Sequence, residues 1–133
     1  MASRRWDAGT GEGDVRTRRN TGAQGGAGPR GPRPRLLAMQ AVASVTGVPA
    51  AAMQSRRLLN REVRRARSLA WYLSHTEYGW PLYRVGAAFD RDRTTVAKAC
   101  REVEDMRDDP ALDGLLDRVG RGLAEITGQA EAA

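Results

Sequence analysis

The sequence predicts an all-α protein, a helix-turn-helix bundle of about six helices that follows a disordered N-terminal tail. From Arg35 to about Gly128, apolar residues recur at helical spacing, and no alternation of period two is longer than a few residues. Residues 1–34 contain eight Gly and three Pro but a single branched apolar residue, so they cannot bury enough surface to offset the entropy of ordering. We therefore expect a tail over 1–34, a helical domain over 35–128 and a disordered end over 129–133.

Two helices are predicted at the start of the domain. The first spans about 36–46 and ends at Gly47, a residue suited to the left-handed conformation that often closes a helix. A short second helix, entered through Pro49, follows up to Met53. The apolar face predicted for the first helix consists of Leu37, Ala41, Val42 and Val45.

A long third helix is predicted from Asn60, a candidate N-cap, to about Thr76. The run 77–81 breaks this helix, because it contains one Gly and one Pro. A short fourth helix then covers about 82–88, where Gly86 allows a neighbouring segment to approach closely. The residues expected to face the core from the third helix are Val63, Ala66, Ala70 and Leu73.

Two further helices complete the domain. After a tight polar turn at 90–92, the fifth helix runs from Asp92 or Arg93 to about Met106. An acidic cap and Pro110 then begin a sixth helix, whose three Gly weaken it by up to roughly 1 kcal/mol each, so packing must hold it in place. The apolar stripe predicted on the sixth helix consists of Leu112, Leu115, Leu116, Val119, Leu123 and Ile126.

The fourth and fifth helices form a helix-turn-helix pattern. In such motifs the second helix enters the major groove of DNA, with its first residues at the base edges. Arg91 and Arg93 then suit guanine, while Thr94 and Thr95 suit a phosphate or a thymine methyl group. The competing interpretation is that the threonines only cap the helix and the arginines are solvated. The polar face of the fifth helix consists of Arg93, Thr94, Ala97, Lys98 and Arg101.

A second basic cluster lies around the start of the third helix. Six cations occur within residues 56–67, and Glu62 is the one acid among them. So many like charges repel one another unless a polyanion neutralises them, and a merely solvated helix face usually carries interleaved acids. Two basic clusters around one core therefore favour a surface that binds nucleic acid. The second cluster consists of Arg56, Arg57, Arg61, Arg64, Arg65 and Arg67.

The charge is unevenly distributed along the chain. Residues 35–101 hold twelve cations and four acids, whereas residues 102–133 hold three cations and nine acids. Of the 22 cations, 21 are Arg, whose planar donors suit phosphate and guanine edges, although a high-GC genome would produce the same bias. The middle of the chain is therefore the part expected to meet a polyanion.

Three blocks of sequence resemble a known family: residues 64–73 (RRARSLAWYL), 82–89 (LYRVGAAF) and 91–101 (RDRTTVAKACR). The stretch from Arg61 to Leu123, and more loosely from Leu36, is similar to the C-terminal DNA-binding domain (domain IV) of the bacterial chromosomal replication initiator DnaA. The resemblance implies that the helical domain over 35–128 is a DnaA domain IV-like helix-turn-helix that binds DNA.

The resemblance also implies which residues contact DNA. In the family, a basic loop before the long helix inserts an Arg into the minor groove, a position that Arg61 resembles. An Arg-Asp-His-Thr-Thr run reads the major groove of the DnaA box, and residues 91–95 resemble that run. With the basic clusters included, the candidate DNA-binding residues are Arg61, Arg64, Arg65, Arg67, Arg91, Asp92, Arg93, Thr94, Thr95, Lys98 and Arg101.

The chain departs from the family in the helix-turn-helix itself. The family has two glycines between the Phe and the Arg of the turn, whereas here Asp90 alone separates Phe89 from Arg91. The His of the family's run is Arg93, and its later His is Lys98. These substitutions keep or add positive charge, and the shortened turn predicts a changed entry angle for the recognition helix.

The basic clusters predict binding to double-stranded DNA by a cytoplasmic, nucleoid-associated protein. The resemblance implies that the binding is sequence-specific, at DnaA-box-like or replication-origin sites, and that it regulates replication initiation. The chain contains no Gly-x-x-x-x-Gly-Lys-Ser/Thr motif, so it resembles a stand-alone domain IV without the AAA+ domain and is not expected to load or melt an origin itself. One alternative is a protein-interaction module that binds the initiator or its regulators, such as an Hda-type AAA+ factor. A helix-turn-helix transcription factor is another.

The composition argues against an enzyme. His75 is the only His and Cys100 the only Cys, which leaves no internal disulfide, no multi-thiolate metal site and no Cys/His nucleophile pair. We therefore expect no catalytic residues, no cofactor, no metal and no small-molecule substrate. No apolar stretch approaches the roughly 20 residues of a membrane-spanning helix, so a membrane partner is not expected either.

Overall fold

The computed structural model describes residues 28–57 and 60–132, with side chains up to residue 128. This part of the chain contains helices and no strand, which confirms the predicted all-α class and the number of helices. Residues 1–27 of the tail predicted for 1–34 lie outside the described residues. The helices are α3 (Arg33–Thr46), α4 (Ala50–Gln54), α5 (Arg61–Glu77), α6 (Leu82–Phe89), α7 (Arg93–Met106) and α8 (Pro110–Ala132).

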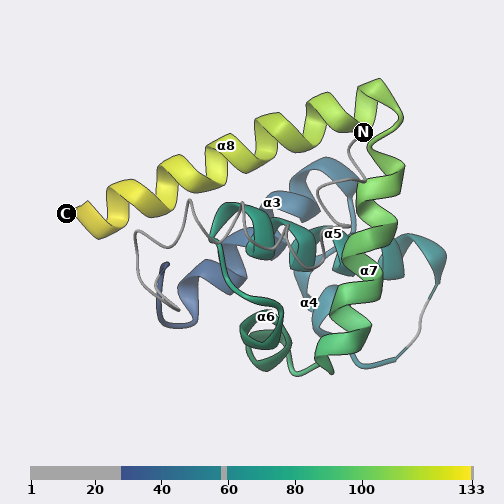
Figure 1. Cartoon of the computed structure of the whole chain (residues 1–133), viewed down its shortest axis with the longest axis horizontal. Helices are drawn as coiled ribbons and strands as arrows, with labels where there is room; N and C mark the ends of the chain where they lie inside the picture. The colour runs from purple at the N-terminus through teal and green to yellow at the C-terminus, as the bar shows by residue number, and fades with distance from the viewer. Residues whose placement is uncertain (1–27, 58–59, 133) are drawn as a thin grey trace.

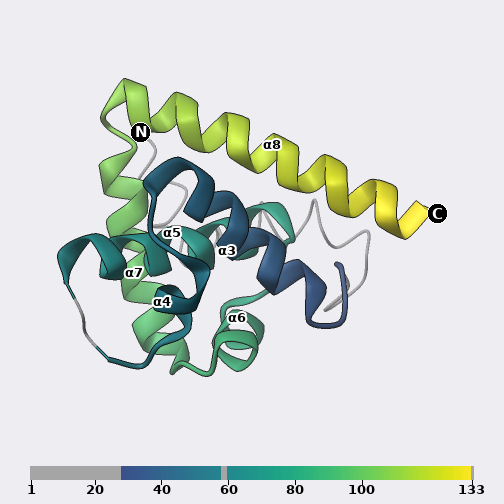
Figure 2. The same ribbon diagram turned by 180° about the vertical axis from the view of Figure 1, so that it is seen from behind.

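Helix α5 forms the centre of the bundle (Figure 1), and each of the other described helices packs against it. Every residue of α5 from Leu69 to Thr76 is buried, as a helix with neighbours on all sides requires. Helix α8 runs across the bundle, and its C-terminal end lies at the opposite end of the molecule from α7 in both views (Figures 1 and 2). The start of α5 lies at the α7 end.

The predicted helix ends are confirmed at two caps. The side chain of Asn60 accepts a hydrogen bond from the backbone N–H of Val63 at 2.8 Å, a contact that stabilises a helix start by about 1 kcal/mol. Gly47 closes α3 with φ of 80°, and its N–H donates to the carbonyl of Ala43 at 2.9 Å.

The buried face of α3 differs from the predicted one. The stripe that packs against the core contains Pro34, Ala38, Met39 and Val42, whereas Val45 is 41% exposed. The helix also begins at Arg33, earlier than expected, because Pro suits a first turn where no N–H partner exists. The predicted face is thus right at Val42 and partly right at Leu37 and Ala41, which pack against the core, and it is wrong at Val45.

Residues 28–34 are packed on the domain although the sequence assigned them to the tail. The carbonyl of Pro29 accepts hydrogen bonds from Nε1 of Trp80 at 3.2 Å and from Nη2 of Arg84 at 2.7 Å. The Tyr78 hydroxyl donates to the carbonyl of Pro34 at 2.7 Å, and both prolines are buried. Backbone carbonyls and proline rings attach this segment to the domain, and a low content of branched apolar residues gives no sign of such contacts.

Helix α8 extends to Ala132 and so enters the stretch 129–133 that was expected to be disordered. Ala, Gln and Glu favour helices, and residues 111–133 contain no proline. The buried stripe of α8 also departs from the predicted one at its end, since Thr127 is buried while Ile126 is 48% exposed. Gly120 lies against Glu77 so closely that an added Cβ would meet its carboxylate at 2.5 Å.

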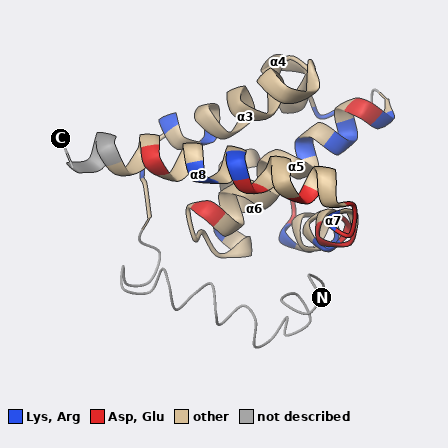
Figure 3. Cartoon of the chain, turned by 90° about the horizontal axis from the view of Figure 1, so that it is seen from above, with Lys and Arg blue, Asp and Glu red and all other residues tan. Residues whose placement is uncertain are grey.

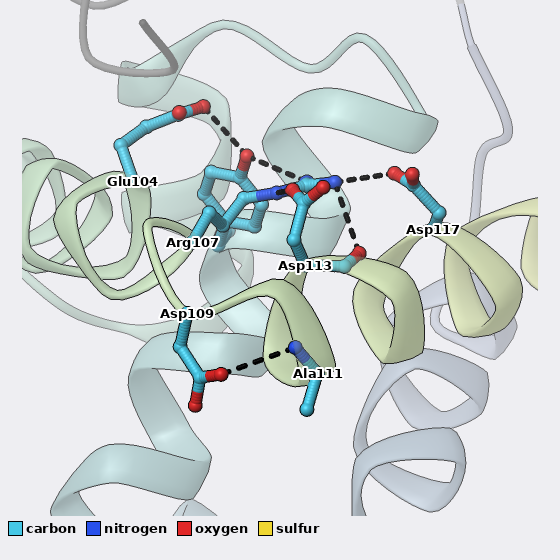
Figure 4. Close-up of polar contacts among 7 residues, drawn as sticks. Glu104, Arg107, Asp109, Ala111, Asp113 and Asp117 are labelled. Carbon is cyan, nitrogen blue, oxygen red and sulfur yellow. Dashed lines mark hydrogen bonds and ion pairs between the residues drawn. The ribbon is translucent and has the colours of Figure 1, made fainter.

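Arg107, at the end of α7, links α8 to α7 and α5 (Figure 4). The side chain of Arg107, only 9% exposed, donates from Nε to Asp113 at 2.5 Å and forms a second ion pair with Asp117. Its Nη1 donates to the hydroxyl of Tyr72 at 3.0 Å, and that hydroxyl donates to Glu104 at 2.6 Å. Asp109 is the acidic cap predicted before Pro110, since its carboxylate accepts a hydrogen bond from the backbone N–H of Ala111 at 3.1 Å.

Candidate nucleic-acid interface

A groove of about 500 Å³ lies between the first half of α5 and one flank of α7. Its lining contains a single acid, Glu102, and one aromatic residue, Trp71. Figure 3 shows the Lys and Arg residues of α5 and α7 on the same side of the molecule. The groove is therefore a strongly positive concavity, and the cations that line it are Arg56, Arg61, Arg64, Arg65, Arg67, Arg91 and Lys98.

Helix α5 carries three of these cations at its exposed first turns. Arg61, Arg64 and Arg65, three members of the predicted second basic cluster, are all exposed. The cap at Asn60 fixes where the helix begins and hence the direction of this face. Their guanidinium groups remain available for phosphate contacts.

Arg67 is buried, although it was grouped with the exposed DNA-binding arginines. It is only 5% exposed, and its Nη2 donates to the backbone carbonyl of Arg57. No carboxylate among the described residues pairs with it, and burial, followed by repulsion from Arg91 and Arg64, lowers its pKa. Spacing could have revealed this position, because Val63, Arg67 and Ala70 fall on one stripe of the helix.

Arg91 supports the fold of the turn. Its Nη2 donates to the carbonyl of Ser55 at 2.8 Å, and Nη1 donates to the carbonyls of Phe89 and Asp90, each at 3.1 Å. The guanidinium also lies 5.9 Å from the ring centre of Trp71. Its pKa is lowered, mainly by burial and next by Arg56. Arg91 is thus a half-buried wall of the groove, where the sequence predicted an exposed reader of guanine.

The start of α7 is fixed by Asp92. Its carboxylate accepts hydrogen bonds from the backbone N–H of Thr94 at 3.0 Å and from the Thr94 hydroxyl. The Thr94 hydroxyl and N–H, in that order, hold the pKa of Asp92 below its usual range. Asp92 is therefore the N-cap, and the Thr94 hydroxyl is engaged within the cap.

The remaining predicted side chains lie on the exposed surface of α7. Thr95 and Lys98 line the groove, whereas Arg93 and Arg101 are exposed but stand outside its lining. The groove thus brings seven of the candidate residues together, whereas the other four lie outside its lining. The seven are Arg61, Arg64, Arg65, Arg67, Arg91, Thr95 and Lys98.

Three charged or aromatic residues of the groove were absent from the candidate set. Arg56 belongs to the basic cluster of the sequence but stands in the α4–α5 segment, where helical spacing gives no direction. Trp71 lines the groove four residues after Arg67, on the same stripe of α5. Glu102 follows Thr95 and Lys98 along α7. Aromatic and acidic residues inside a basic stretch are the signal that could have identified the last two.

The histidine, cysteine and acidic side chains of the described residues bear on other chemistries. No group of three or more His, Cys, Asp or Glu in the described ranges is arranged to hold a metal ion. Cys100 is buried, which raises the pKa of its thiol, and Nδ1 of His75 lies 2.7 Å from the carbonyl of Trp80. Among the helices described, none is long and apolar enough to cross a membrane.

Comparison with protein families gives a match over residues 37–103, half of the chain, to the bacterial DnaA protein helix-turn-helix. This range includes the turn, most of α7 and every lining residue of the groove except Met106. No curated protein and no solved structure matched. The family's helix-turn-helix is a DNA-binding domain rather than a catalytic one. The resemblance predicted from the three sequence blocks is confirmed, and the chain belongs to the bacterial DnaA helix-turn-helix family.

Proposed function

We propose that this protein binds double-stranded DNA sequence-specifically, at DnaA-box-like or replication-origin sites, and regulates the initiation of replication. Its membership of a DNA-binding family supports DNA as the ligand. The observation that carries the proposal is the groove, in which seven cations face a single acid beside an exposed helix-turn-helix.

The charge balance of the groove supports a polyanionic ligand. Each phosphate neutralised by Arg or Lys releases condensed counterions from DNA, so binding is favoured most at low salt. Exposed guanidinium groups at Arg61, Arg64 and Arg65 suit phosphate because their planar donors match its oxygens. In this role the first turns of α5 follow the DNA backbone.

The exposed surface of α7 supports base recognition. Arg93, Thr95 and Lys98 project from its first turns, the part of a recognition helix that reaches base edges in the major groove. Arg93 has donors for guanine, and Thr95 has a methyl group for thymine. Since Asp92 and Thr94 hydrogen-bond each other, we assign them the role of fixing the helix start.

Fluorescence anisotropy tests the proposal. Labelled duplexes that contain a DnaA box or its scrambled sequence are titrated with the protein between 50 and 200 mM salt, a range over which several phosphate contacts cost orders of magnitude in affinity. We expect tighter binding to the box. Arg64→Ala should reduce the slope of log K against log salt by about 0.9. Arg118→Ala, an exposed change on α8, should leave the slope unchanged.

The proposed regulation of replication initiation is tested by experiments in cells. Genome-wide occupancy should concentrate at the origin, and deletion should alter the timing of initiation. Occupancy spread over promoters would instead favour a transcription factor. Capture of the initiator or of an AAA+ regulator that persists after nuclease treatment would favour the protein-interaction module. Equal binding to box and scrambled duplexes would refute sequence specificity.

A further inference from the structure

Asp90 occupies the turn of the helix-turn-helix in a conformation that few residues adopt. Its φ of 57° and ψ of 52° are left-handed, and it is the one non-glycine residue with positive φ in the part of the chain that the structure describes. Its carboxylate lies 2.7 Å from Nη1 of Arg56, which also donates to the Asp90 carbonyl at 2.8 Å. Arg56 lines the basic groove.

We propose that Asp90 is an internal competitor of the DNA backbone: its carboxylate neutralises Arg56 in the free protein, and a DNA phosphate takes its place in the complex. This inference rests on the proposed function and names a regulator of the same groove. A carboxylate and a phosphate present similar oxygens to a guanidinium, so one can replace the other without a change in the position of Arg56.

The pair is suited to exchange because it is exposed. The side chains of Arg56 and Asp90 are 67% and 88% exposed, so solvent and salt screen their attraction. Among the described residues, Asp90 is the only hydrogen-bond partner of the Arg56 side chain. A phosphate in the groove needs to displace only this one weak partner.

A second contact, from Arg91, keeps the turn in place while Arg56 exchanges Asp90 for a phosphate. Arg91 donates to the carbonyl of Ser55, and an anion does not compete for a donor that a backbone carbonyl holds within a half-buried wall. The α4–α5 segment therefore stays attached to the helix-turn-helix when Arg56 changes partner. The hydrogen bond from Arg91 to Ser55 thus persists in the DNA complex, whereas the ion pair between Arg56 and Asp90 is exchanged.

A double-mutant cycle with DNA tests the inference. Asp90→Asn removes the charge and keeps a residue type that tolerates the left-handed conformation, and Asp90→Gly is a second variant that adopts it freely. With the DnaA-box duplex at low salt, we expect Asp90→Asn to tighten binding about two- to fivefold, the range of an exposed ion pair. The gain in affinity should shrink as salt rises, because salt screens the Arg56–Asp90 pair, whereas the number of phosphate contacts is the same in both complexes.

The same substitution in an Arg56→Ala background should have a much smaller effect, because the competed cation is absent. Asp108→Asn, the same charge change at an exposed position after α7, is the matched control and should change neither affinity nor slope. Melting temperatures of all variants confirm that they are folded.

Three outcomes overturn the inference. Unchanged or weaker binding by both Asp90 variants means that Asp90 does not compete with DNA. An equal gain with and without Arg56 means that Asp90 acts by general repulsion of phosphate. In both cases the wild-type protein still binds DNA and the proposed function stands. Failure of the wild-type protein to bind any duplex refutes the proposed function, and this inference with it.

Discussion

Nη2 of Arg91 donates to the backbone carbonyl of Ser55 at 2.8 Å and so joins the turn of the helix-turn-helix to the segment that precedes α5. The two residues are 36 positions apart in the sequence. This bond fixes both walls of the basic groove relative to each other. The shortened turn of this chain is therefore held by an arginine that its family resemblance assigned to base recognition.

Loss of this tie should destabilise the protein. We expect Arg91→Ala to lower the free energy of unfolding by about 1–2 kcal/mol, since it removes hydrogen bonds to three carbonyls and the contact with Trp71. Urea unfolding followed by circular dichroism measures the change. The exposed neighbour Arg93 is the control, and Arg93→Ala should change stability by less than about 0.5 kcal/mol. Similar losses for the two variants would contradict the structural role of Arg91.

Replacement of Arg67 should affect DNA affinity and the free energy of unfolding differently. Its guanidinium is buried without a carboxylate, so Arg67→Met should leave the free energy of unfolding unchanged or raise it by about 1 kcal/mol. DNA affinity should fall equally for box and scrambled duplexes, because the groove loses a cation. Parallel urea and anisotropy titrations provide both quantities. A marked loss of stability would show that the bond to the Arg57 carbonyl outweighs the cost of burying the charge.

The ion pairs of Arg107 should hold α8 on the bundle. We expect Arg107→Ala to cost about 2–4 kcal/mol, because it leaves the Tyr72 hydroxyl and two carboxylates without their donor. Arg107→Lys should restore only part of this, since an ammonium group cannot reach the same set of oxygens. Thermal unfolding measures both. Equal stability of the Ala and Lys variants would exclude a role for the guanidinium geometry.

Alkaline pH should destabilise the fold through two tyrosines. Burial, and next Glu104, raises the pKa of Tyr72, and burial raises the pKa of Tyr78. Since both groups hold their protons more tightly in the folded state, their contribution is complete below the unfolded pKa of about 10 and is lost as pH rises above it. Melting temperatures from pH 8 to 11 should therefore fall. Tyr72→Phe should flatten the fall, whereas Tyr83→Phe, at a 60% exposed position, should not.

The surface of α7 should decide sequence preference. We expect Arg93→Ala to reduce the ratio of box to scrambled affinity about tenfold or more, the range of one bidentate base contact. Arg64→Ala should weaken both duplexes by the same factor, because a phosphate contact carries no sequence information. Competition titrations give the two ratios. If both variants changed the ratio alike, the assignment of phosphate contacts to α5 and base contacts to α7 would be wrong.

The sequence predicted most of this architecture because its signals are local. The cap at Asn60, the left-handed Gly47 and the short turn at 90–92 are encoded by residue type within a few positions. The convergence of Arg61 and Lys98 on one groove was also expected, from helical spacing and from the family resemblance.

The rest depended on contacts between distant segments. The carbonyl of Ser55 determines what Arg91 does, and the sequence around Arg91 gives no indication of it. The same is true of Pro29, which is anchored by Trp80, and of Arg107, whose partners come from two other helices. Polar groups that bind backbone carbonyls leave no periodic pattern, so their roles appear only in three dimensions.

The packing of Pro29 beside Thr127 has a practical consequence. These residues line a common pocket, so the first described residues and the last turns of α8 meet at the end of the molecule that lies away from α7 (Figure 1). A fluorescent protein or a surface tether joined directly to Gly28, or to the end of α8, starts from that end. The domain can thus be immobilised or carried by a larger partner while its basic groove stays open to a passing duplex.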